Sequence, residues 1–169
     1  MAESSIVKNK RDGTLVITDN GGVNSLTISF EAGDLSLTIP GPTVSNYLDR
    51  GRFSSPPSLR YVDDQPITGT FTAYLRSFGD DATPDAVAVL AEIIAQQGFV
   101  ASDWVSTLGT DGEVQCYSFT WTVEGTDHGD DHDHVLALDY VVFTGSIAEG
   151  DPDQISISFT SHSLYPALT

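Results

Sequence analysis

The second half of this chain contains no lysine and no arginine. All seven basic residues lie at or before Arg76, whereas sixteen of the 24 acidic residues follow it. Seven basic and eight acidic residues give residues 1–76 a charge of −1, and residues 77–169 carry −16, in agreement with the formal net charge of −17. Such a field repels polyanions. The composition therefore argues against a protein that holds nucleic acid tightly.

Cysteine, lysine and long apolar runs are also scarce. The single cysteine, Cys116, excludes an internal disulfide and a metal site built from several thiolates. The longest apolar run, residues 86–91, is far shorter than the roughly 20 residues that cross a bilayer, so we expect no membrane association. The polar residues 1–11 lack the apolar stretch of a signal peptide. Only two lysines accompany 18 aspartates, which resembles proteins of halophilic hosts, where molar salt screens surface charge.

Most of the chain is rich in β-branched residues or alternates polar and apolar residues with the two-residue period of strands. The segments that read in this way are residues 14–18, 26–30, 35–39, 67–78, 116–123, 135–144 and 155–160. Residues 19–22, Asp-Asn-Gly-Gly, form a strong turn signal, and 26–30 and 35–39 read as a hairpin. The sequence predicts a mainly β protein: one domain over residues 1–169, an antiparallel β-sandwich or curled sheet.

One helix interrupts this pattern. Thr83 suits an N-cap, Pro84 suits the first helical position, and Gly98 suits the residue after the last turn. Apolar residues between them recur with helical spacing. We therefore predict a flanking α-helix over residues 84–97 that packs against the sheet.

A long extended loop is predicted over residues 40–66, because five prolines break any regular pattern there. The loop is too aromatic and apolar for a free linker. Two interpretations stand: a lid over the protein's own core, or an arm that docks on another subunit. Its arginines are three of the chain's seven positive charges and would suit an acidic neighbour. The candidate contact residues are Tyr47, Arg50, Arg52, Phe53, Arg60 and Tyr61.

The segment 127–134 combines histidines and aspartates, which are ligands for Zn²⁺, Ni²⁺ or Mn²⁺. In an extended conformation Asp130, His132 and His134 share one face, with His128 nearby. The spacing matches neither a closed zinc site nor an EF-hand loop, and its Asp and Gly content favours a solvated hairpin tip. We expect no cofactor, and keep a divalent metal at His128, Asp130, His132 and His134 as the alternative.

No enzyme signature is present. The sequence lacks a Gly-x-Ser-x-Gly elbow, a His-Glu-x-x-His motif and a Gly-rich phosphate loop. His162, in a Ser-His-Ser run, is interpreted as a surface histidine. Trp104 and Trp121 could form a sugar platform, although Trp121 falls in the aromatic core stripe. We therefore expect a protein that is not an enzyme.

The order of elements resembles the major tail tube protein of long-tailed, siphovirus-like viruses. A polar N-terminal arm, residues 1–12, precedes the strands, and Gly-Asp-Leu-Ser-Leu-Thr-Ile at 33–39 leads into the long loop 40–66. Thr-Gly-Thr-Phe-Thr-Ala-Tyr-Leu at 68–75 returns from the loop, followed by one helix and the C-terminal strands. The resemblance covers nearly the whole chain but rests on element order, not on a diagnostic motif.

The resemblance implies a structural virion protein. Six copies would form a ring whose inner sheets close into a ring-wide β-barrel, and rings would stack head to tail through the loop and the terminal arms. The implied partners are the protein itself, a tape-measure protein, tail terminator and tip proteins, and double-stranded DNA that passes without tight binding. The implied location is the tail tube of a virion, assembled in the host cytoplasm and used for genome ejection.

Two other functions stay open at this point. The chain could be another virion β-sandwich, such as a tail terminator, tail-tip or decoration protein, which forms one ring or binds as a monomer. It could also be a carbohydrate- or metal-binding module that uses the tryptophans or the 127–134 segment. Repeated serine and threonine faces favour the tube, because such a wall would be wet and make no phosphate contacts.

Overall fold

The fold is described here from a computed structural model of the chain. The structure describes residues 13–19, 22–28, 34–41, 43–47, 58–63, 65–75, 79–80, 83–84, 86–96, 114–123, 125, 131–163 and 167–168. The strands are β1 (Gly13–Thr18), β2 (Ser25–Ile28), β3 (Ser36–Thr38), β4 (Thr43–Tyr47), β5 (Ser58–Asp63), β6 (Ile67–Tyr74), β7 (Gly79–Asp80), β8 (Thr83–Pro84), β9 (Tyr117–Val123), β10 (His134–Ala148), β11 (Gln154–Ser161) and β12 (Ala167–Leu168). Among the described residues the helix is α1 (Ala86–Ala95).

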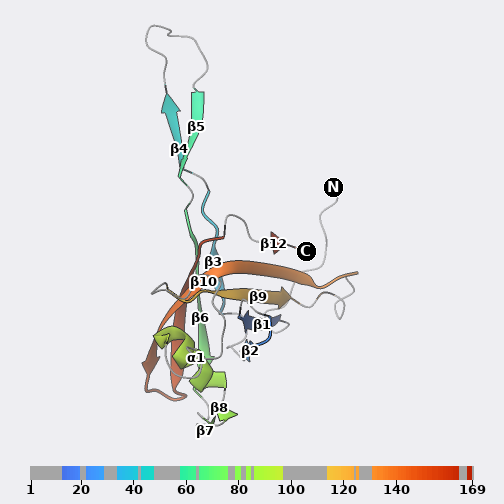
Figure 1. The fold of residues 1–169 in the computed structure, drawn as a ribbon, viewed down its shortest axis with the longest axis vertical. Coiled ribbons are helices and arrows are strands. Elements are labelled where there is room, and N and C mark those ends of the chain that lie inside the picture. Colours follow the sequence, from blue (N-terminus) through green and yellow to red (C-terminus); the bar gives the residue numbers. More distant parts are fainter. Residues whose placement is uncertain are drawn as a thin grey trace.

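Eight strands form one antiparallel sheet in the order β2-β1-β9-β10-β11-β6-β3, with β12 paired to β10. The long strand β10 lies in the middle of this sheet and belongs to both of its halves: β2-β1-β9 with the first part of β10, and the last part of β10 with β11-β6-β3. Its first part pairs with β9, its last part pairs with β11, and the register shifts between Leu138 and Val141. Tyr140, inside this bulge, has a φ of 53°, a value that a non-glycine residue rarely adopts. The bulge bends β10, so that the sheet divides into two halves that cross one another (Figure 1).

Aromatic rings from both halves fill the space between them. Phe119 of β9 and Phe159 of β11 lie with their ring centroids 4.7 Å apart, and Phe71 and Phe143 contact the same pair. One hydrophobic cluster therefore joins the two halves. The predicted β-sandwich with its alternating core residues is confirmed, but a single folded sheet supplies both layers.

The turn predicted at residues 19–22 joins β1 to β2. The buried Asp19 carboxylate accepts hydrogen bonds from the backbone N–H groups of Val23 and Asn24, at 3.0 and 3.2 Å. The predicted hairpin between 26–30 and 35–39 is wrong. β2 pairs with β1 and β3 pairs with β6, so these two strands lie at opposite ends of the sheet. Alternation fixes which residues share a face, but it carries no information about the neighbouring strand.

The predicted helix is confirmed as α1, two residues shorter at each end. Thr83 and Pro84, predicted as the N-cap and first turn, instead pair with β7 as strand β8. The helix buries Val89, Leu90 and Ile93 and contacts β10 and β2. After Ala95 the chain turns at Gln96, with a φ of 54°. Within the described part of the chain, no helix has the length and apolar character needed to cross a membrane.

The segment predicted as a long loop contains regular structure. β4 and β5 pair antiparallel, with Tyr47 opposite Ser58 and Val44 opposite Tyr61. This β4–β5 hairpin projects away from the folded sheet, beyond the end where β3 and β6 pair (Figure 1). The loop prediction missed the strands because prolines at both ends of the segment, and Pro56 and Pro57 directly before β5, obscured the short strand runs between them.

Candidate assembly surfaces

One half of the sheet is formed by β3, β6, β11 and the last part of β10, and its outer face carries hydroxyl groups in aligned rows. Ser36, Thr70, Ser158 and Thr144 lie side by side across β3, β6, β11 and β10. A second row contains Thr38, Thr68 and Thr160, and a third contains Thr72, Ser156 and Ser146. Most of these residues are exposed. We call these ten residues the hydroxyl face; it contains no charged residue.

The opposite face of the same four strands is packed against the core. Gly69 lies between Thr68 and Thr70 along β6, and it faces inward where these two neighbours face outward. A Cβ added at Gly69 would clash with the ring of Phe159 and would lie 2.6 Å from the backbone oxygen of Ser36. The missing side chain therefore lets β3 approach the sheet over the Phe159 ring. The alternation in the sequence predicted that Gly69 lies on the apolar side of its strand, but it did not predict that Gly69 lets β3 approach.

Two strand edges that flank the hydroxyl face carry no partner among the described residues. β3 pairs only with β6, and β10 beyond Val141 pairs only with β11, within the part of the chain that the structure describes. Such edges present unpaired N–H and C=O groups, which are templates for pairing with another chain. The face is therefore a four-stranded unit, β3-β6-β11-β10, that can be extended on both sides.

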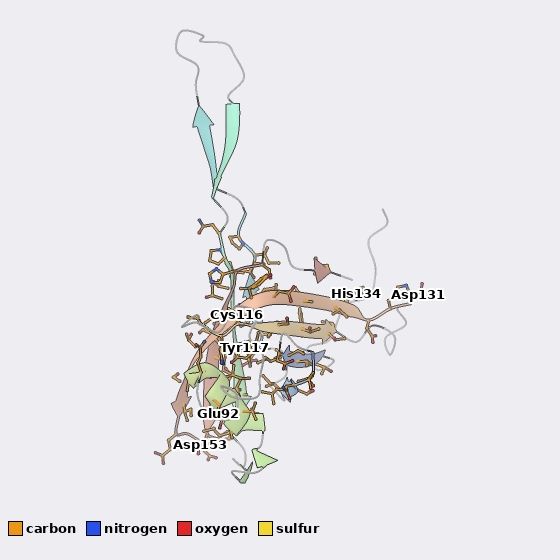
Figure 2. All side chains as sticks on the ribbon, viewed as in Figure 1. Glu92, Cys116, Tyr117, Asp131, His134 and Asp153 are labelled. Atoms are coloured by element: carbon orange, nitrogen blue, oxygen red, sulfur yellow. The ribbon has the colours of Figure 1, made fainter. Side chains whose placement is uncertain are left out.

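Acidic residues of the described C-terminal region lie at strand ends and bends instead of on this face. Asp131 and Asp133 precede β10, and Asp139 lies at its bulge. Glu149, Asp151 and Asp153 form the exposed β10–β11 turn, where the Asp153 carboxylate accepts a hydrogen bond from Gly150 N–H at 2.7 Å. Asp153 lies at the end of the molecule opposite the β4–β5 hairpin (Figure 2). Among the described residues that follow β9, the acidic side chains thus lie before β10, at its bulge and in the β10–β11 turn.

The predicted contact residues fall on and around the projecting hairpin. Tyr47 lies in β4, and Arg60 and Tyr61 lie in β5, opposite Ser45 and Val44. Arg50, Arg52 and Phe53 lie outside the described residues, as does the predicted N-terminal arm, residues 1–12. The structure therefore brings Tyr47, Arg60 and Tyr61 onto one two-stranded element. Their contact with another subunit stays a prediction.

The predicted metal ligands are partly described. His132 and His134 are exposed at the start of β10, whereas His128 and Asp130 lie outside the described residues. Asp133 between the two histidines accepts a hydrogen bond from Gly125 N–H at 2.9 Å. Three or more metal-ligating side chains do not converge anywhere in the described part of the chain. The metal site stays a prediction.

A polar chain links the end of α1 to the core. The Gln96 side-chain amide donates to the Gln115 carbonyl oxygen at 3.1 Å, and the Tyr117 hydroxyl donates to Gln115 Oε1 at 2.9 Å. Burial raises the pKa of Tyr117 well above its ordinary value, and the neighbouring Cys116 raises it further. Trp121, the candidate sugar platform, packs half-buried against the core, and Trp104 lies outside the described residues. The hydrogen bonds among Gln96, Gln115 and Tyr117 therefore anchor the end of α1 to the core.

Sequence reasoning missed the hydroxyls that hold the β10 bulge. Ser161 and Ser163 flank His162, which is exposed as predicted. Both serine hydroxyls donate to the carbonyl oxygen of Asp139, and Ser163 Oγ accepts from its N–H at 2.7 Å. The Ser-His-Ser run was the available signal, but only the folded sheet brings it beside Asp139.

Comparison with known proteins gives matches in structure alone. No protein-family model and no curated protein matches the sequence. A chain of the anti-feeding prophage baseplate, solved with 6-fold symmetry, superposes with a TM-score of 0.59 at 8% identity, covering 100% of this chain and 97% of that chain. A chain of the sheath–tube complex of the extracellular contractile injection system PVC, in its extended state, gives 0.59 at 9% identity over 99% of both chains.

A third solved structure, the PVC sheath/tube terminator in its extended state, gives a TM-score of 0.58 at 10% identity, covering 100% of this chain and 99% of that chain. At such low identity these likenesses concern the fold. The matched structures belong to contractile injection assemblies, whereas the resemblance noted from the sequence is to tail tube proteins of long-tailed viruses. The long-tailed virus and the halophilic host stay predictions. This chain has, over its whole length, the fold of components of phage-tail-like injection assemblies.

Proposed function

We propose that this chain is a structural subunit of a phage-tail-like tube, in which six copies form a ring and rings stack head to tail. The observation that carries the proposal is the hydroxyl face: an exposed, charge-free wall of four strands within a chain of net charge −17. The whole-length likeness to a chain from a 6-fold symmetrised baseplate supports the same arrangement.

Ring closure uses the two open edges of the four-stranded unit. The β3 edge of one copy pairs with the β10 edge, beyond Val141, of the next, and six repeats of this contact close a barrel. Closure of this kind satisfies the edge N–H and C=O groups that a single copy leaves open. It also places the ten hydroxyl residues on the inner wall and the helix α1 on the outer side.

The wall suits a conduit. Hydroxyl groups keep water at the surface. Because the hydroxyl face contains no lysine or arginine, it offers no contacts to phosphate groups that would hold DNA. The described acidic residues that follow β9 lie at strand ends and bends, where they repel a polyanion without creating a binding site along the hydroxyl face. Double-stranded DNA, preceded by a tape-measure protein, therefore passes through such a tube without tight binding.

Stacking uses the β4–β5 hairpin. It projects from one end of the body, and the acidic β10–β11 turn lies at the other end (Figure 2). A head-to-tail contact between such different ends repeats without closing and generates a filament. The assembled tube belongs to a virion or an injection particle, is built in the host cytoplasm, and ends at terminator and tip proteins.

Negative-stain electron microscopy of the purified full-length chain, at low and at molar salt, tests the proposal. We expect six-fold rings or tubes in at least one condition. Only monomers in both conditions, also after addition of a preformed tail tip, would contradict the tube. No enzymatic activity is expected in either state.

A terminator is the second candidate, because the solved terminator structure matches this chain as well as the sheath–tube structure does, at TM-scores of 0.58 and 0.59. A terminator caps the tube with one ring and does not polymerise. The two functions differ in the same micrographs. Single rings that never stack, at any protein concentration, favour the terminator, whereas stacks of several rings favour the tube.

A further inference from the structure

An apolar pocket of about 370 Å³ lies where the first part of β10 begins. The described residues that line it are Trp121, Val123, His134, Val135, Leu136 and Leu168. The pocket belongs to the half of the sheet formed by β2, β1, β9 and the first part of β10, which we call the outer half. None of its lining residues belongs to the hydroxyl face or to the β4–β5 hairpin.

The pocket continues the apolar side of the outer half beyond the core. Leu136 lies opposite Trp121 of β9 and opposite Leu168 of β12. Leu136 is 8% exposed and Trp121 packs half-buried against the core, whereas Leu168 is 68% exposed. The apolar surface therefore extends past the part that the four-stranded unit covers, and it ends in a pocket that can receive an apolar side chain.

The other end of the outer half carries exposed apolar side chains. This end is the bend of β10, where Val141 pairs with both β9 and β11. Tyr140, in the bulge, is 44% exposed, and Val114, shortly before β9, is 50% exposed. Figure 2 shows Cys116 near the bend and His134 at the far end of the same strands. A bulky residue rarely holds a positive φ, so an exposed tyrosine in this backbone indicates a role outside the subunit's own core.

We infer that the pocket receives Tyr140 of the neighbouring copy in the ring. The inference rests on the proposed function, because it requires the ring in which β3 of one copy pairs with β10 of the next. It adds a second contact, in the outer layer, to the strand pairing of the inner layer. It applies to a tube and to a terminator alike, since both contain the ring.

The crossing of the two halves decides which ends meet. Ring closure repeats the four-stranded unit sideways, across its strands, and the strands of the outer half cross these strands, so they run along the ring. From the bend, the outer half extends toward the side on which β3 lies (Figure 1). The neighbour on that side contributes its β10 edge, which begins directly after Tyr140. The pocket end of one copy therefore faces the bend end of the next.

The distances agree with this contact. Six copies of four strands, about 4.8 Å apart, enclose a radius of about 18 Å, and the outer half packs about 10 Å farther out, where each copy advances the ring by about 30 Å. Tyr140 follows His134 by six positions in β10, which span about 20 Å. The remaining gap of about 10 Å between backbones is the usual spacing of layers joined by interdigitating side chains.

The chemistry of the pocket suits a tyrosine. The aliphatic side chains contact the ring, while the indole N–H of Trp121 and the imidazole of His134 are polar groups that can bond its hydroxyl. Carboxylates border both sides of the contact, with Asp131 and Asp133 next to His134, and Asp139 next to Tyr140. This like-charge border opposes the contact at low salt and is screened at molar salt, so salt strengthens the contact.

Cysteine cross-linking of the full-length chain tests the contact. In the variant Tyr140→Cys/Leu168→Cys, we expect a short bis-maleimide to link chains into dimers and larger multimers at molar salt. Within one chain, Leu168 lies opposite Leu136, four positions before Tyr140, so the two thiols are about 13 Å apart and a shorter reagent joins only different copies. Assembled rings in which peptide mass spectrometry finds no 140–168 link would overturn the inference.

Two controls make the cross-link specific. Ile147→Cys/Leu168→Cys moves one thiol to a similarly exposed apolar residue of the same strand, 55% exposed and about 20 Å beyond the bend, and should give no link. Leu168→Cys alone reports any link to the native Cys116, which is buried and free. Equal linking in Ile147→Cys/Leu168→Cys and in Tyr140→Cys/Leu168→Cys would overturn the inference.

A matched pair of substitutions measures what the tyrosine ring contributes. Tyr140→Ala removes the ring and should raise the protein concentration needed for ring formation about tenfold, whereas Tyr140→Phe keeps the ring and should raise it far less. The melting temperature of the unassembled subunit shows that both variants are folded. Equal assembly of the two variants would overturn the contact.

Electron microscopy of the cross-linked samples separates this inference from the proposed function. Rings or tubes without 140–168 links would overturn the pocket contact and leave the tube intact. Links between chains in particles that are neither rings nor tubes would support the contact and contradict the tube. The absence of both rings and links would contradict both.

Discussion

The hydroxyl of Ser161 donates a hydrogen bond of 2.8 Å to the carbonyl oxygen of Asp139. Ser161 is fully buried, and Asp139 immediately precedes Tyr140, whose φ of 53° marks the bulge of β10. Ser163 Oγ donates to the same carbonyl oxygen at 2.6 Å. The end of β11 therefore holds the bend that divides one sheet into two layers. The crossing of the halves depends on this small set of hydroxyl contacts.

Replacing Ser161 with alanine should lower the free energy of unfolding by about 1–2 kcal/mol, because the buried hydroxyl donates to Asp139 and accepts a hydrogen bond from Ser163 N–H, and both bonds are lost. Denaturant unfolding followed by tryptophan fluorescence measures the change. Ser158→Ala, on the exposed hydroxyl face, is the control and should change it by less than about 0.5 kcal/mol. Ser161→Ala/Ser163→Ala should be non-additive, since both residues serve one carbonyl. Equal effects of Ser161→Ala and Ser158→Ala would contradict the role of Ser161 in holding the β10 bulge.

Gly69→Ala should destabilise the fold by about 1–3 kcal/mol, because its Cβ meets the Phe159 ring and the backbone of β3. Gly41→Ala is the matched control, since a Cβ at Gly41 has no neighbour within 4 Å. Thermal unfolding compares the two variants. If β3 forms one edge of the ring, Gly69→Ala should also impair assembly more than its lost stability explains. A melting temperature unchanged from that of Gly41→Ala would refute the close approach.

Alkaline pH should destabilise the fold through Tyr117. Its pKa is raised by burial, so the unfolded chain ionises near pH 10, before the folded chain does. The stability that the neutral Tyr117 contributes is therefore complete below about pH 10 and is lost as pH rises toward its folded-state pKa. Unfolding curves between pH 8 and pH 11 should show a less steep loss for Tyr117→Phe. Tyr140→Phe, at an exposed tyrosine, serves as the control, and equal slopes for both variants would exclude Tyr117 as the cause.

A lysine on the hydroxyl face should convert a passive wall into a binding wall. Ser158→Lys adds six positive charges to each ring of the proposed tube, and DNA retention by assembled tubes should rise steeply as salt falls. Val23→Lys, exposed on the β1–β2 turn, adds the same charge away from the face. Retention by native tubes, Ser158→Lys tubes and Val23→Lys tubes can be compared by sedimentation with labelled DNA. Equal retention by the two lysine variants would show that the hydroxyl face does not line the lumen.

Salt should stabilise the subunit. With a formal charge of −17, self-repulsion decreases as ionic strength rises, so the melting temperature should increase from low salt to molar salt. Differential scanning fluorimetry in a series of sodium chloride concentrations measures this. A melting temperature that does not change with salt would contradict the halophilic interpretation of the acidic composition. The negative charge would then be explained by assembly or by the passage of the genome.

Local features of the fold follow from the sequence. Alternation in β6, β9 and β11 predicted which residues face the core, and Phe71, Phe119 and Phe159 are buried there. The Asp-Asn-Gly-Gly run predicted the first turn, and the helical spacing predicted α1. These features depend on residues a few positions apart, so periodicity and turn chemistry are sufficient.

Partners and bends depended on the tertiary structure. The pairing of β3 with β6, the bulge at Tyr140 and the open pocket beside Trp121 all join residues distant in sequence. A two-residue period is the same whichever strand lies alongside, so it specifies faces and leaves partners open. The sequence by itself determined most of the strands of the folded sheet, their inner faces and a net charge that argues against tight nucleic-acid binding. Only packing, through Gly69 under β3 and Ser161 at the bulge, decided how one sheet becomes two layers and which of its edges are open to another copy.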